Sequence, residues 1–472
     1  MVEAFNRAQS LSRARLPRFL CFPGGQTSPF LGGVLEKGQT PSEKLDLKPG
    51  DRVRIKSKDA IVNVLMVIPN VGPLGGSERS ALLAASGLRR LGHRVYLMHA
   101  GDEAVPNFDG HLSTPAAFNA AYVDGRAVRR DIARIASFVD AHRIDVCHVQ
   151  WIPRLGVYAW LARTLPLVHS IHVTPCPNGA RYLWRDRQPC ERRIGLGCVT
   201  TGYRSHGCGT LGNGQPIGLL AFTRAFASDH RMRSLVRQAD RVVVPSEWLA
   251  AYLHRHRIED ESIEIIEPPL LPMHDYVPPV VTSPPAVLFV GRLVDFKGAD
   301  HVVRASALIQ AEHRVVIVGG GPMEAQLRSL ASELGVANHV EFVGAPGAAA
   351  AVPFRANSAV AVMPSLAPET YGMVGPEALA AGLPVVTYRV GGVAQWLEAA
   401  GSMAACVDPG DVEALAAEIE RFLSFPPNAE QRRATAERLR RSLSVERHAT
   451  RLHETYERAA EVSKGKGLTH VR

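Results

Sequence analysis

Two glutamates separated by seven residues form the strongest chemical signal in the sequence. Glu369 lies in a polar stretch, and Glu377 follows Pro376, a residue suited to the first turn of a helix. With Glu369 in a loop and Glu377 in the first helical turn, both carboxylates would face one bound ligand, and such a pair suits vicinal hydroxyls. The alternative is two surface residues, with Glu377 favoured only by the positive helix N-terminus.

The backbone of the same segment offers a site for an anion. Thr370, Tyr371, Gly372 and Met373 precede the expected helix, and free N–H groups at a helix N-terminus attract negative charge. We therefore expect these four residues to bind a phosphorylated part of the ligand.

A cationic pair follows an apolar strand expected at residues 286–290. Arg292 and Lys297 stand five residues apart in a segment that leads into a helix. A guanidinium offers bidentate geometry and an ammonium adds a point charge, so the pair could clamp a diphosphate. Two solvated cations are the alternative.

Glycines shape two further turns. Gly75 and Gly76 follow the first expected strand, where a backbone without side chains can approach a phosphate at a helix N-terminus. A plain strand-to-helix turn is the alternative. The Gly-Gly-Gly-Pro turn at 319–322 lacks the G-x-G-x-x-G spacing of dinucleotide sites, so we expect a mainly structural role.

Seven cysteines occur in the chain, and four of them gather within residues 176–208. An odd number of cysteines in a cytosolic chain argues against a disulfide framework. Four thiolates could form a tetrahedral structural zinc site, although no C-x2-C pair is present. Reduced, partly buried thiols are the alternative for this set, which comprises Cys176, Cys190, Cys198 and Cys208.

Short apolar runs alternate with helix-period segments twice along the chain, which predicts two α/β units with parallel sheets. The expected strands are 61–68, 93–99, 145–149, 167–171, 241–244 and 263–266, then 286–290, 314–318, 339–343, 359–363 and 384–388. Seven prolines within residues 268–285 favour a linker between the units. Ligands in such sheets bind beyond the carboxyl ends of the strands, so we expect the site in a cleft between the units.

The glutamate segment resembles the E-x7-E signature of retaining GT-B glycosyltransferases, in particular glycosyltransferase family 4. The continuation Ala-Ala-Gly-Leu-Pro-Val-Val and the pair Gly391-Gly392 are similar to that family as well. The stretch around Arg292 and Lys297 resembles its G-R-L-x-x-x-K-G motif, and residues 72–79 resemble its G-G-x-E loop. The resemblance spans roughly residues 60–460 and is firmest in the C-terminal half.

This resemblance implies a role for each of these side chains. Glu369 should contact hydroxyls of the donor sugar, and Glu377 the ribose of the nucleotide. Arg292 and Lys297 should bind the diphosphate and stabilise charge on the leaving group. His172 ends the strand 167–171, where the family often has a histidine near the donor sugar. The alternative is a buried histidine whose hydrogen bonds are made within the core.

The resemblance also carries two departures and a mechanism. Tyr371 stands where the family usually has phenylalanine, and Gly375 replaces a bulkier residue, which alters packing rather than the carboxylates. No nucleophile for a double displacement is evident. The resemblance therefore favours a front-face reaction, in which the donor phosphate helps to deprotonate the acceptor hydroxyl.

We predict a GT-B architecture, with two Rossmann-like doubly wound domains that face each other across a cleft. The expected division is a disordered basic tail (1–58), an acceptor-binding N-terminal domain (59–270) with a cysteine-containing insertion (176–210), a linker (271–285), a donor-binding C-terminal domain (286–440), and a helix (441–472) that packs back on the N-terminal domain.

Composition and charge narrow the class of protein. The chain is 46% hydrophobic and 21% charged, as globular proteins are, and holds no run of about 18–20 apolar residues that could span a membrane. The basic start lacks the apolar stretch of a secretion signal, so we expect a cytoplasmic protein. The net charge of +9 collects in the tail and in residues 181–241. No nucleic-acid-binding motif accompanies it, and an anionic inner membrane surface fits it, with a solvated basic face as the alternative.

Taken together, the residues and the resemblance predict transfer of a sugar from a UDP- or GDP-linked donor to a saccharide or lipid-linked acceptor. The expected outcome is retention of configuration, in polysaccharide or glycolipid synthesis, with no cofactor for the chemistry beyond the donor itself. The alternatives are a nucleotide-sugar epimerase of the same fold and a non-catalytic protein that binds sugar nucleotides.

Overall fold

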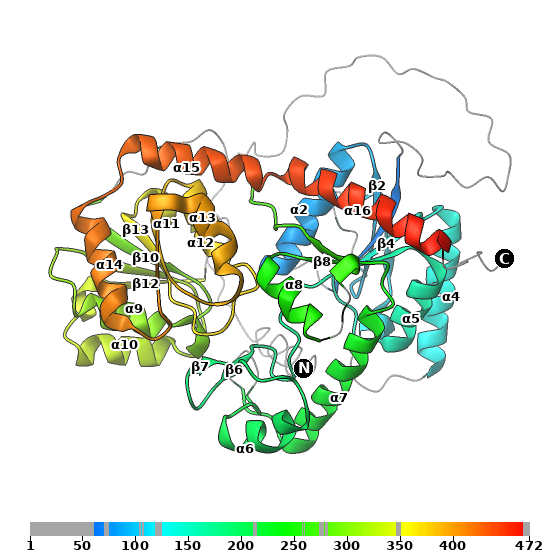
Figure 1. The fold of residues 1–472 in the computed structure, drawn as a ribbon, viewed down its shortest axis with the longest axis horizontal. Helices are drawn as coiled ribbons and strands as arrows, with labels where there is room; N and C mark the ends of the chain where they lie inside the picture. Colours follow the sequence, from blue (N-terminus) through cyan, green and yellow to red (C-terminus); the bar gives the residue numbers. More distant parts are fainter. Residues whose placement is uncertain are drawn as a thin grey trace, which may run out of the picture.

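The computed structural model describes residues 61–465, with gaps at 70–74, 103–104, 106–107, 119–124, 211–214, 257, 259, 273–277, 279–281 and 346–350. The expected tail at 1–58 and the last seven residues lie outside the described part. Two α/β units stand side by side, and the last two helices run from one unit to the other (Figure 1).

The N-terminal unit is built on a seven-stranded parallel sheet. Its strand order is β3-β2-β1-β4-β5-β8-β9. The strands are β1 (Asn63–Val67), β2 (Arg94–His99), β3 (Gly110–Ser113), β4 (Val146–Val149), β5 (Leu167–Ser170), β8 (Arg241–Val244) and β9 (Ile263–Ile265). Burial on both faces explains why β1 and β8 are nearly continuous apolar runs, whereas the edge strands β3 and β9 are less buried and contain polar residues.

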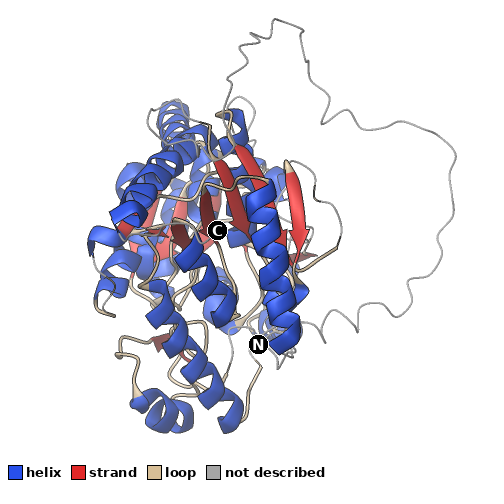
Figure 2. Ribbon diagram, turned by 90° about the vertical axis from the view of Figure 1, so that its right-hand side faces the viewer, coloured by secondary structure: helices blue, strands red, loops and turns tan. Residues whose placement is uncertain are grey.

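Helices cover both faces of this sheet, as the side view shows (Figure 2). They are α2 (Gly76–Arg90), α3 (Pro115–Phe118), α4 (Gly125–Ala141), α5 (Leu155–Thr164), α7 (Leu219–Val236) and α8 (Glu247–His254). Alternate residues of β1 enter different cores, with Leu65 packing among residues of α4 and α5, and Met66 among residues of α2. Because side chains alternate along a strand, one short apolar run serves both layers.

The C-terminal unit has a six-stranded parallel sheet of order β12-β11-β10-β13-β14-β15. Its strands are β10 (Ala286–Val290), β11 (Arg314–Val318), β12 (Val340–Gly344), β13 (Val360–Met363), β14 (Val385–Tyr388) and β15 (Ala404–Val407). Its helices are α9 (Ala299–Ser306), α10 (Glu324–Glu333), α11 (Val352–Ala356), α12 (Val374–Ala380), α13 (Ala394–Ala400), α14 (Val412–Ser424) and α15 (Ala429–Ser442). The two parallel α/β units predicted from the sequence are confirmed.

The last helix, α16 (Val445–Gly465), leaves the C-terminal unit and lies on the N-terminal one (Figure 1). Ala449, Leu452 and Tyr456 are fully buried in the core that also contains α2. A side chain at Gly87 of α2 would lie 2.9 Å from Cβ of Ala449, so this glycine permits the close crossing of the two helices.

The insertion between β5 and β8 forms a separate small substructure. A two-stranded hairpin, β6 (Tyr182–Leu183) and β7 (Gln188–Pro189), is followed by the π-helix η2 (Cys198–Gly202) and by α6 (Tyr203–Ser205). The remaining short helical turns are η3 (Asp260–Ser262), η4 (Asp295–Lys297), η5 (Ala337–His339), η7 (Gly391–Val393) and η8 (Gly401–Met403).

Two helix boundaries differ from those that the apolar pattern predicts, which are 77–91, with Ser77 as N-cap, and 297–310. Helix α2 begins at Gly76 with Gly75 as its N-cap, and the hydroxyl of Ser77 donates to Glu78 Oε2 instead of capping the helix. Helix α9 begins only at Ala299, after Gly298, whose φ is +69°. A Cβ there would lie 2.1 Å from the carbonyl oxygen of Pro364, so the close approach of this loop requires glycine.

Candidate active site

Glu369 lies in the loop after β13, and the backbone of two glycines, Gly391 and Gly392, packs against that loop. The amide of Gly392 donates to the Glu369 carbonyl at 2.7 Å. A Cβ at Gly391 would lie 2.2 Å from that same carbonyl oxygen, and one at Gly392 would lie 2.3 Å from the carbonyl oxygen of Thr370. The Gly-Gly pair therefore fixes the backbone on which the first glutamate stands.

The carboxylate of Glu369 is held by a cation and a hydroxyl. Lys297 Nζ lies 2.5 Å from Glu369 Oε1, and Ser365 Oγ donates to the same oxygen at 2.5 Å. Burial would raise the pKa of Glu369, but Lys297, the Ser365 hydroxyl and the more distant Arg292 outweigh it, so the pKa is lowered. The structure thus brings Glu369 and Lys297 together as an ionised pair.

Glu377 lies in the first turn of α12, where it is buried and paired with two arginines. Arg355 of α11 donates to Glu377 Oε2, and Arg79 of α2 donates to Oε1. Burial lowers the pKa of Arg355, although the charge of Glu377 opposes that shift. Because Arg79 belongs to the N-terminal unit, this carboxylate joins the two units.

Arg292 is exposed in the loop after β10, with its guanidinium 5.8 Å from the ring centroid of Phe296. The glycine turn at 319–321 packs against this loop. The carbonyl of Gly320 accepts from Leu293 N at 3.0 Å, and a Cβ at Gly319 would lie 1.7 Å from the carbonyl oxygen of Gly291. The turn therefore shapes the loop that carries Arg292.

Tyr371, Gly372 and Met373 connect the two glutamates. The Tyr371 ring is buried, and its carbonyl accepts from Trp396 Nε1 at 2.7 Å. A Cβ at Gly375 would lie 2.4 Å from the Trp396 ring. The indole therefore occupies the space that a bulkier residue at position 375 would need.

The N-terminal unit contributes the start of α2 and the end of β5. Gly75 and Gly76 are exposed at the N-terminus of α2, whereas the preceding part of their motif, 72–74, falls outside the described residues. His172 follows β5, and its carbonyl accepts from Thr370 Oγ1 at 2.9 Å. The strand ends of both units thus meet at Thr370.

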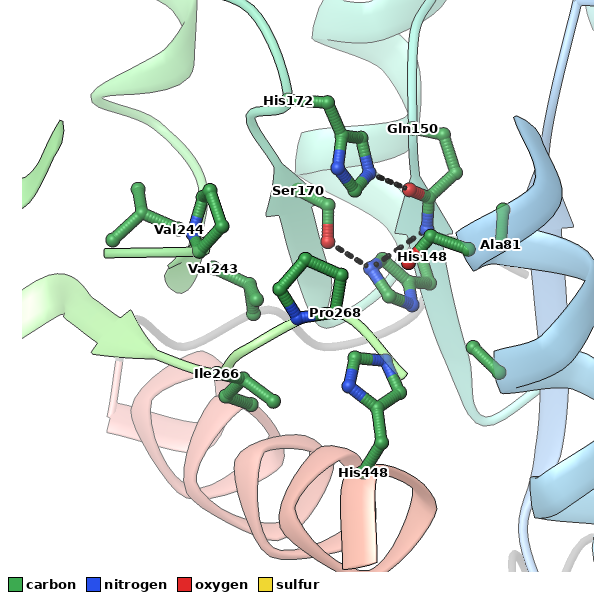
Figure 3. Close-up of a pocket in the computed structure, with 13 residues that line it drawn as sticks. Ala81, His148, Gln150, Ser170, His172, Val243, Val244, Ile266, Pro268 and His448 are labelled. Atoms are coloured by element: carbon green, nitrogen blue, oxygen red, sulfur yellow. Dashed lines mark hydrogen bonds between the residues drawn. The ribbon is translucent and has the colours of Figure 1, made fainter. Parts of the chain in front are cut away.

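A buried polar network lies beneath His172 (Figure 3). His172 Nε2 is 2.5 Å from Gln150 Oε1, and Gln150 Nε2 is 3.1 Å from His148 Nε2. Ser170 Oγ lies 2.8 Å from that same His148 nitrogen. Burial lowers the pKa of His172 to about 4, so its ring is neutral at pH 7.

The expected zinc site is not supported. No three His, Cys, Asp or Glu side chains are arranged to hold a metal ion anywhere in the described residues, which include all four cysteines of the insertion. Cys190 and Cys208 pack instead with Leu183 and Phe222 in a small apolar cluster. Burial raises the pKa of Cys208 to about 11, so this thiol stays protonated.

The insertion packs on the loop that carries Lys297. Tyr182 donates to Asp295 Oδ2 at 2.7 Å, and Arg187 pairs with Asp295 at 3.1 Å and with Asp300 at 2.9 Å. The contacts flank Lys297 on both sides in the sequence. A segment of the N-terminal half therefore braces the cationic loop of the C-terminal unit.

Three residues of this site were missed from the sequence: Arg79, Arg355 and Gln150. Arg79 directly follows the Gly-Gly-Ser-Glu stretch, and Gln150 directly follows β4, so position beyond a strand end was an available signal. For Arg355, the only signal in the sequence was a charged residue within an otherwise apolar segment, Val352–Ala356.

Comparison with known families assigns both units. Residues 75–269 match the glycosyl transferase 4-like domain, and residues 277–441 match glycosyl transferases group 1. The structure of Alr3699/HepE from Anabaena, solved with UDP and glucose, has a TM-score of 0.57 at 18% identity and covers 84% of this chain and 99% of its own. The fold class is therefore GT-B, as predicted. Together the matches support a glycosyltransferase, and within that class one of the GT4 type.

Two curated relatives illustrate the range of this similarity. D-inositol 3-phosphate glycosyltransferase of Thermomonospora curvata is 29% identical over 69% of this chain and 74% of its own length. A GDP-mannose-dependent alpha-(1-6)-phosphatidylinositol monomannoside mannosyltransferase of Mycolicibacterium smegmatis is 36% identical over 31% of this chain and 40% of its own. Across the curated relatives, matches cover from 26% to 74% of the relative.

The described residues form no helix that is long and apolar enough to cross a membrane.

Proposed function

We propose that this chain transfers a hexose from a nucleotide-diphosphate donor to a hydroxyl of its acceptor, with retention of configuration. Glu369 would bind hydroxyls of the donor sugar and Glu377 those of the ribose. Arg292 and Lys297 would bind the diphosphate, assisted by the glycines at 75 and 76 and by the backbone of residues 370–373. His172 would contact the sugar from the N-terminal side.

The observation that carries this proposal is the contact between Lys297 and Glu369. It joins a cation suited to a diphosphate with a carboxylate suited to a sugar, and Glu377 follows in the same segment, in the first turn of α12. When a donor enters, its phosphates would take over Lys297, and its hydroxyls would take over the released carboxylate. Arg292 and Lys297 would then stabilise the charge that develops on the leaving group.

For the retention that we propose, the surroundings of Glu369 favour a front-face route over a double displacement. Its carboxylate is already paired with Lys297 and Ser365, which suits hydrogen bonding to hydroxyls rather than attack on a sugar carbon. A front-face reaction remains, in which a donor phosphate oxygen accepts the proton of the acceptor hydroxyl while the bond to the leaving diphosphate breaks. Closure of the two units around the donor would exclude water.

For the acceptor we propose a saccharide or lipid-linked glycan, with polysaccharide or glycolipid as the product. Residues 181–241 contain eleven arginines against four acidic residues, which suits an acceptor that carries phosphate or lies on an anionic membrane face. The two curated relatives above are named for an inositol phosphate and for a phosphatidylinositol glycan. Flotation with anionic and with neutral vesicles tests the membrane contact.

A thermal-shift screen against UDP, GDP, ADP and their sugars tests the donor. A nucleotide present at 100 times its Kd should stabilise the protein by about 2.7 kcal/mol. The base that gives the largest shift identifies the donor. No shift with any nucleotide at millimolar concentration would contradict the proposal.

Glu369→Gln and Lys297→Ala test the chemistry. Each should lower sugar transfer by at least about 100-fold, because each removes a charge that faces the reacting groups, while far-UV circular dichroism stays unchanged. Glu324→Gln and Arg328→Ala make the same changes in an exposed ion pair of α10 and should leave turnover unaltered. Full turnover in both site variants would rule out this assignment.

Two product analyses separate the alternatives. Incubation with the nucleotide sugar alone would change the sugar itself if the protein were an epimerase. Proton NMR of the transfer product reports the anomeric configuration, and inversion would contradict the front-face mechanism. A protein that binds the donor but neither transfers nor hydrolyses it with any acceptor is a binding protein only.

A further inference from the structure

The network beneath His172 continues past Gln150 and His148 into the C-terminal helix. His148 Nδ1 lies 2.8 Å from the hydroxyl of Tyr456, a fully buried residue of α16. Four side chains, Tyr456, His148, Gln150 and His172, thus form one unbroken hydrogen-bonded chain. Its two ends are 284 positions apart in the sequence.

The amide of Gln150 gives this chain a direction. An amide oxygen only accepts and an amide nitrogen only donates, so the oxygen facing His172 requires a proton on His172 Nε2. The amide nitrogen donates to His148 Nε2, which must therefore carry a lone pair. A neutral His148 then holds its proton on Nδ1 and donates it to the Tyr456 hydroxyl.

The surroundings keep both histidine rings neutral. Burial lowers the pKa of His148 well below its usual value, and the neighbouring His172, His448 and His169 lower it further. His148, His172 and His448 line a small cavity of about 10 Å³, together with Ser170 and Gln150 (Figure 3). No carboxylate lines this cavity. With one proton per ring, the position of that proton on each ring is decided by its hydrogen-bond partners.

We propose that Tyr456 is a positioning residue, which fixes His172 as the Nε2–H tautomer through His148 and Gln150. This inference rests on the proposed function for its consequence. His172 Nδ1, which bonds no other described residue, is then an acceptor for a hydroxyl of the sugar or of the acceptor substrate. The helix that crosses between the units would thereby set the chemical state of a side chain in the site.

The chain has a second self-consistent arrangement, which loss of the Tyr456 hydroxyl would favour. Without its hydroxyl, the Nδ1–H of His148 would be a buried donor with no acceptor, which is unfavourable. Moving that proton to Nε2 gives it Ser170 Oγ as a partner. The amide of Gln150 must then turn over, and His172 becomes the Nδ1–H tautomer with no acceptor lone pair on that nitrogen.

Tautomers can be read directly by two-bond ¹H–¹⁵N correlation spectra of protein with ¹⁵N-labelled histidine, without any ligand. A His172→Gln variant assigns the signal of interest among the 18 histidines. We expect the Nε2–H pattern for His172 in the unaltered protein and the Nδ1–H pattern, or a mixture, in Tyr456→Phe. Nδ1–H in the unaltered protein, or an unchanged pattern in Tyr456→Phe, would overturn the proposal.

Tyr158→Phe is the matched control. Tyr158 is also a fully buried tyrosine bonded to a buried histidine, with its hydroxyl 3.0 Å from His169 Nδ1. That pair shares no hydrogen bond with Gln150 or His172. Both substitutions remove one buried hydroxyl, so both should lower the melting temperature alike, but only Tyr456→Phe should change the His172 pattern. A change in both variants would indicate general loosening and contradict the proposal.

Kinetics then test the consequence. Tyr456→Phe should lower kcat by about tenfold, measured as UDP release from UDP-glucose or GDP release from GDP-mannose, whichever the protein turns over, while KM for that donor changes less than about twofold. A fall confined to KM would contradict a role for the tautomer in the chemical step. Should neither donor be turned over, the spectra still decide the tautomer, so failure of the proposed function and failure of this inference remain distinguishable.

Discussion

The two walls of the candidate site, one on each α/β unit, are held together by different interactions. On the C-terminal side, Glu369 is paired with Lys297, and Glu377 is paired with Arg355 and with Arg79 of the N-terminal unit. On the N-terminal side, His172 and Gln150 are neutral and joined by hydrogen bonds alone. Charge suits recognition of a diphosphate, whereas neutral donors and acceptors with fixed directions suit discrimination between hydroxyl groups. Under the proposed function, the charged side would supply most of the donor affinity, and His172 and Gln150 would join Glu369 in recognising the hydroxyls of the sugar.

The largest effect on stability should come from breaking the buried ion pair of the charged wall. Arg355→Met removes the more buried partner of Glu377 and leaves that carboxylate with Arg79 only. We expect a loss of about 3 kcal/mol in the free energy of unfolding, measured by urea titration. Arg328→Met, in an exposed pair, should cost less than about 0.5 kcal/mol. Equal losses in the two variants would show that burial does not matter here.

Mild acid should weaken the neutral wall before the charged one. Burial lowers the pKa of His172 and His448 to about 4 and that of His169 to about 3, whereas unfolded histidine titrates near 6.5. The unfolded chain therefore binds more protons between about pH 6.5 and pH 4, and stability falls as the pH drops through that range. Glu369, with its lowered pKa, keeps its charge until the pH falls below the usual carboxylate range.

We expect a loss of about 1 kcal/mol for each of these histidines between about pH 7 and pH 5.5, measured by urea titration at both values. His448→Gln removes one titrating group and should lose about 1 kcal/mol less over the same interval. An equal free energy of unfolding at both pH values would contradict the neutral state of these rings.

The smallest effect should come from Arg79→Met. This side chain is partly exposed, so its loss should change stability by less than about 1 kcal/mol. Because Glu377 would no longer give up a partner when ribose binds, UDP or GDP should bind about two- to fivefold more tightly by calorimetry. Weaker binding would mean instead that Arg79 contacts the bound nucleotide.

The difference between the two walls also explains which residues of the site could be predicted from the sequence. The charged wall was visible because Glu369 and Glu377 share one local segment and Lys297 lies in a recognisable turn. The arginines that pair with Glu377 could not be predicted, because no sequence spacing relates Arg79 to a glutamate 298 positions away. Position beyond a strand end pointed to His172, but nothing in the sequence links it to Tyr456. Such contacts arise only when the sheet and the last helix are assembled.

The fold itself followed well from apolar runs and prolines, with errors where tertiary contacts override local pattern. Helix α9 begins at Ala299 rather than at Lys297, because Gly298 is left-handed and the carbonyl of Pro364 leaves no room there for a side chain. The clustering of four cysteines left zinc ligands and reduced thiols as alternatives, and in the structure Cys190 and Cys208 pack in an apolar cluster. The sequence places the insertion within the acceptor-binding domain, and nothing in its spacing indicates the ion pairs of Arg187 with Asp295 and Asp300.

Helix α16 has a consequence for how the protein is made. Ala449, Leu452, Tyr456 and Ala459 are wholly buried in the core of the N-terminal unit, so that unit is completed by a helix translated after the whole C-terminal unit. Until α16 has been synthesised, an apolar face of the N-terminal unit stays exposed, which favours assistance by chaperones. Stop codons or fusions placed within this helix would thus damage the N-terminal unit, and expression of that unit alone should yield insoluble protein unless the helix is supplied as a peptide.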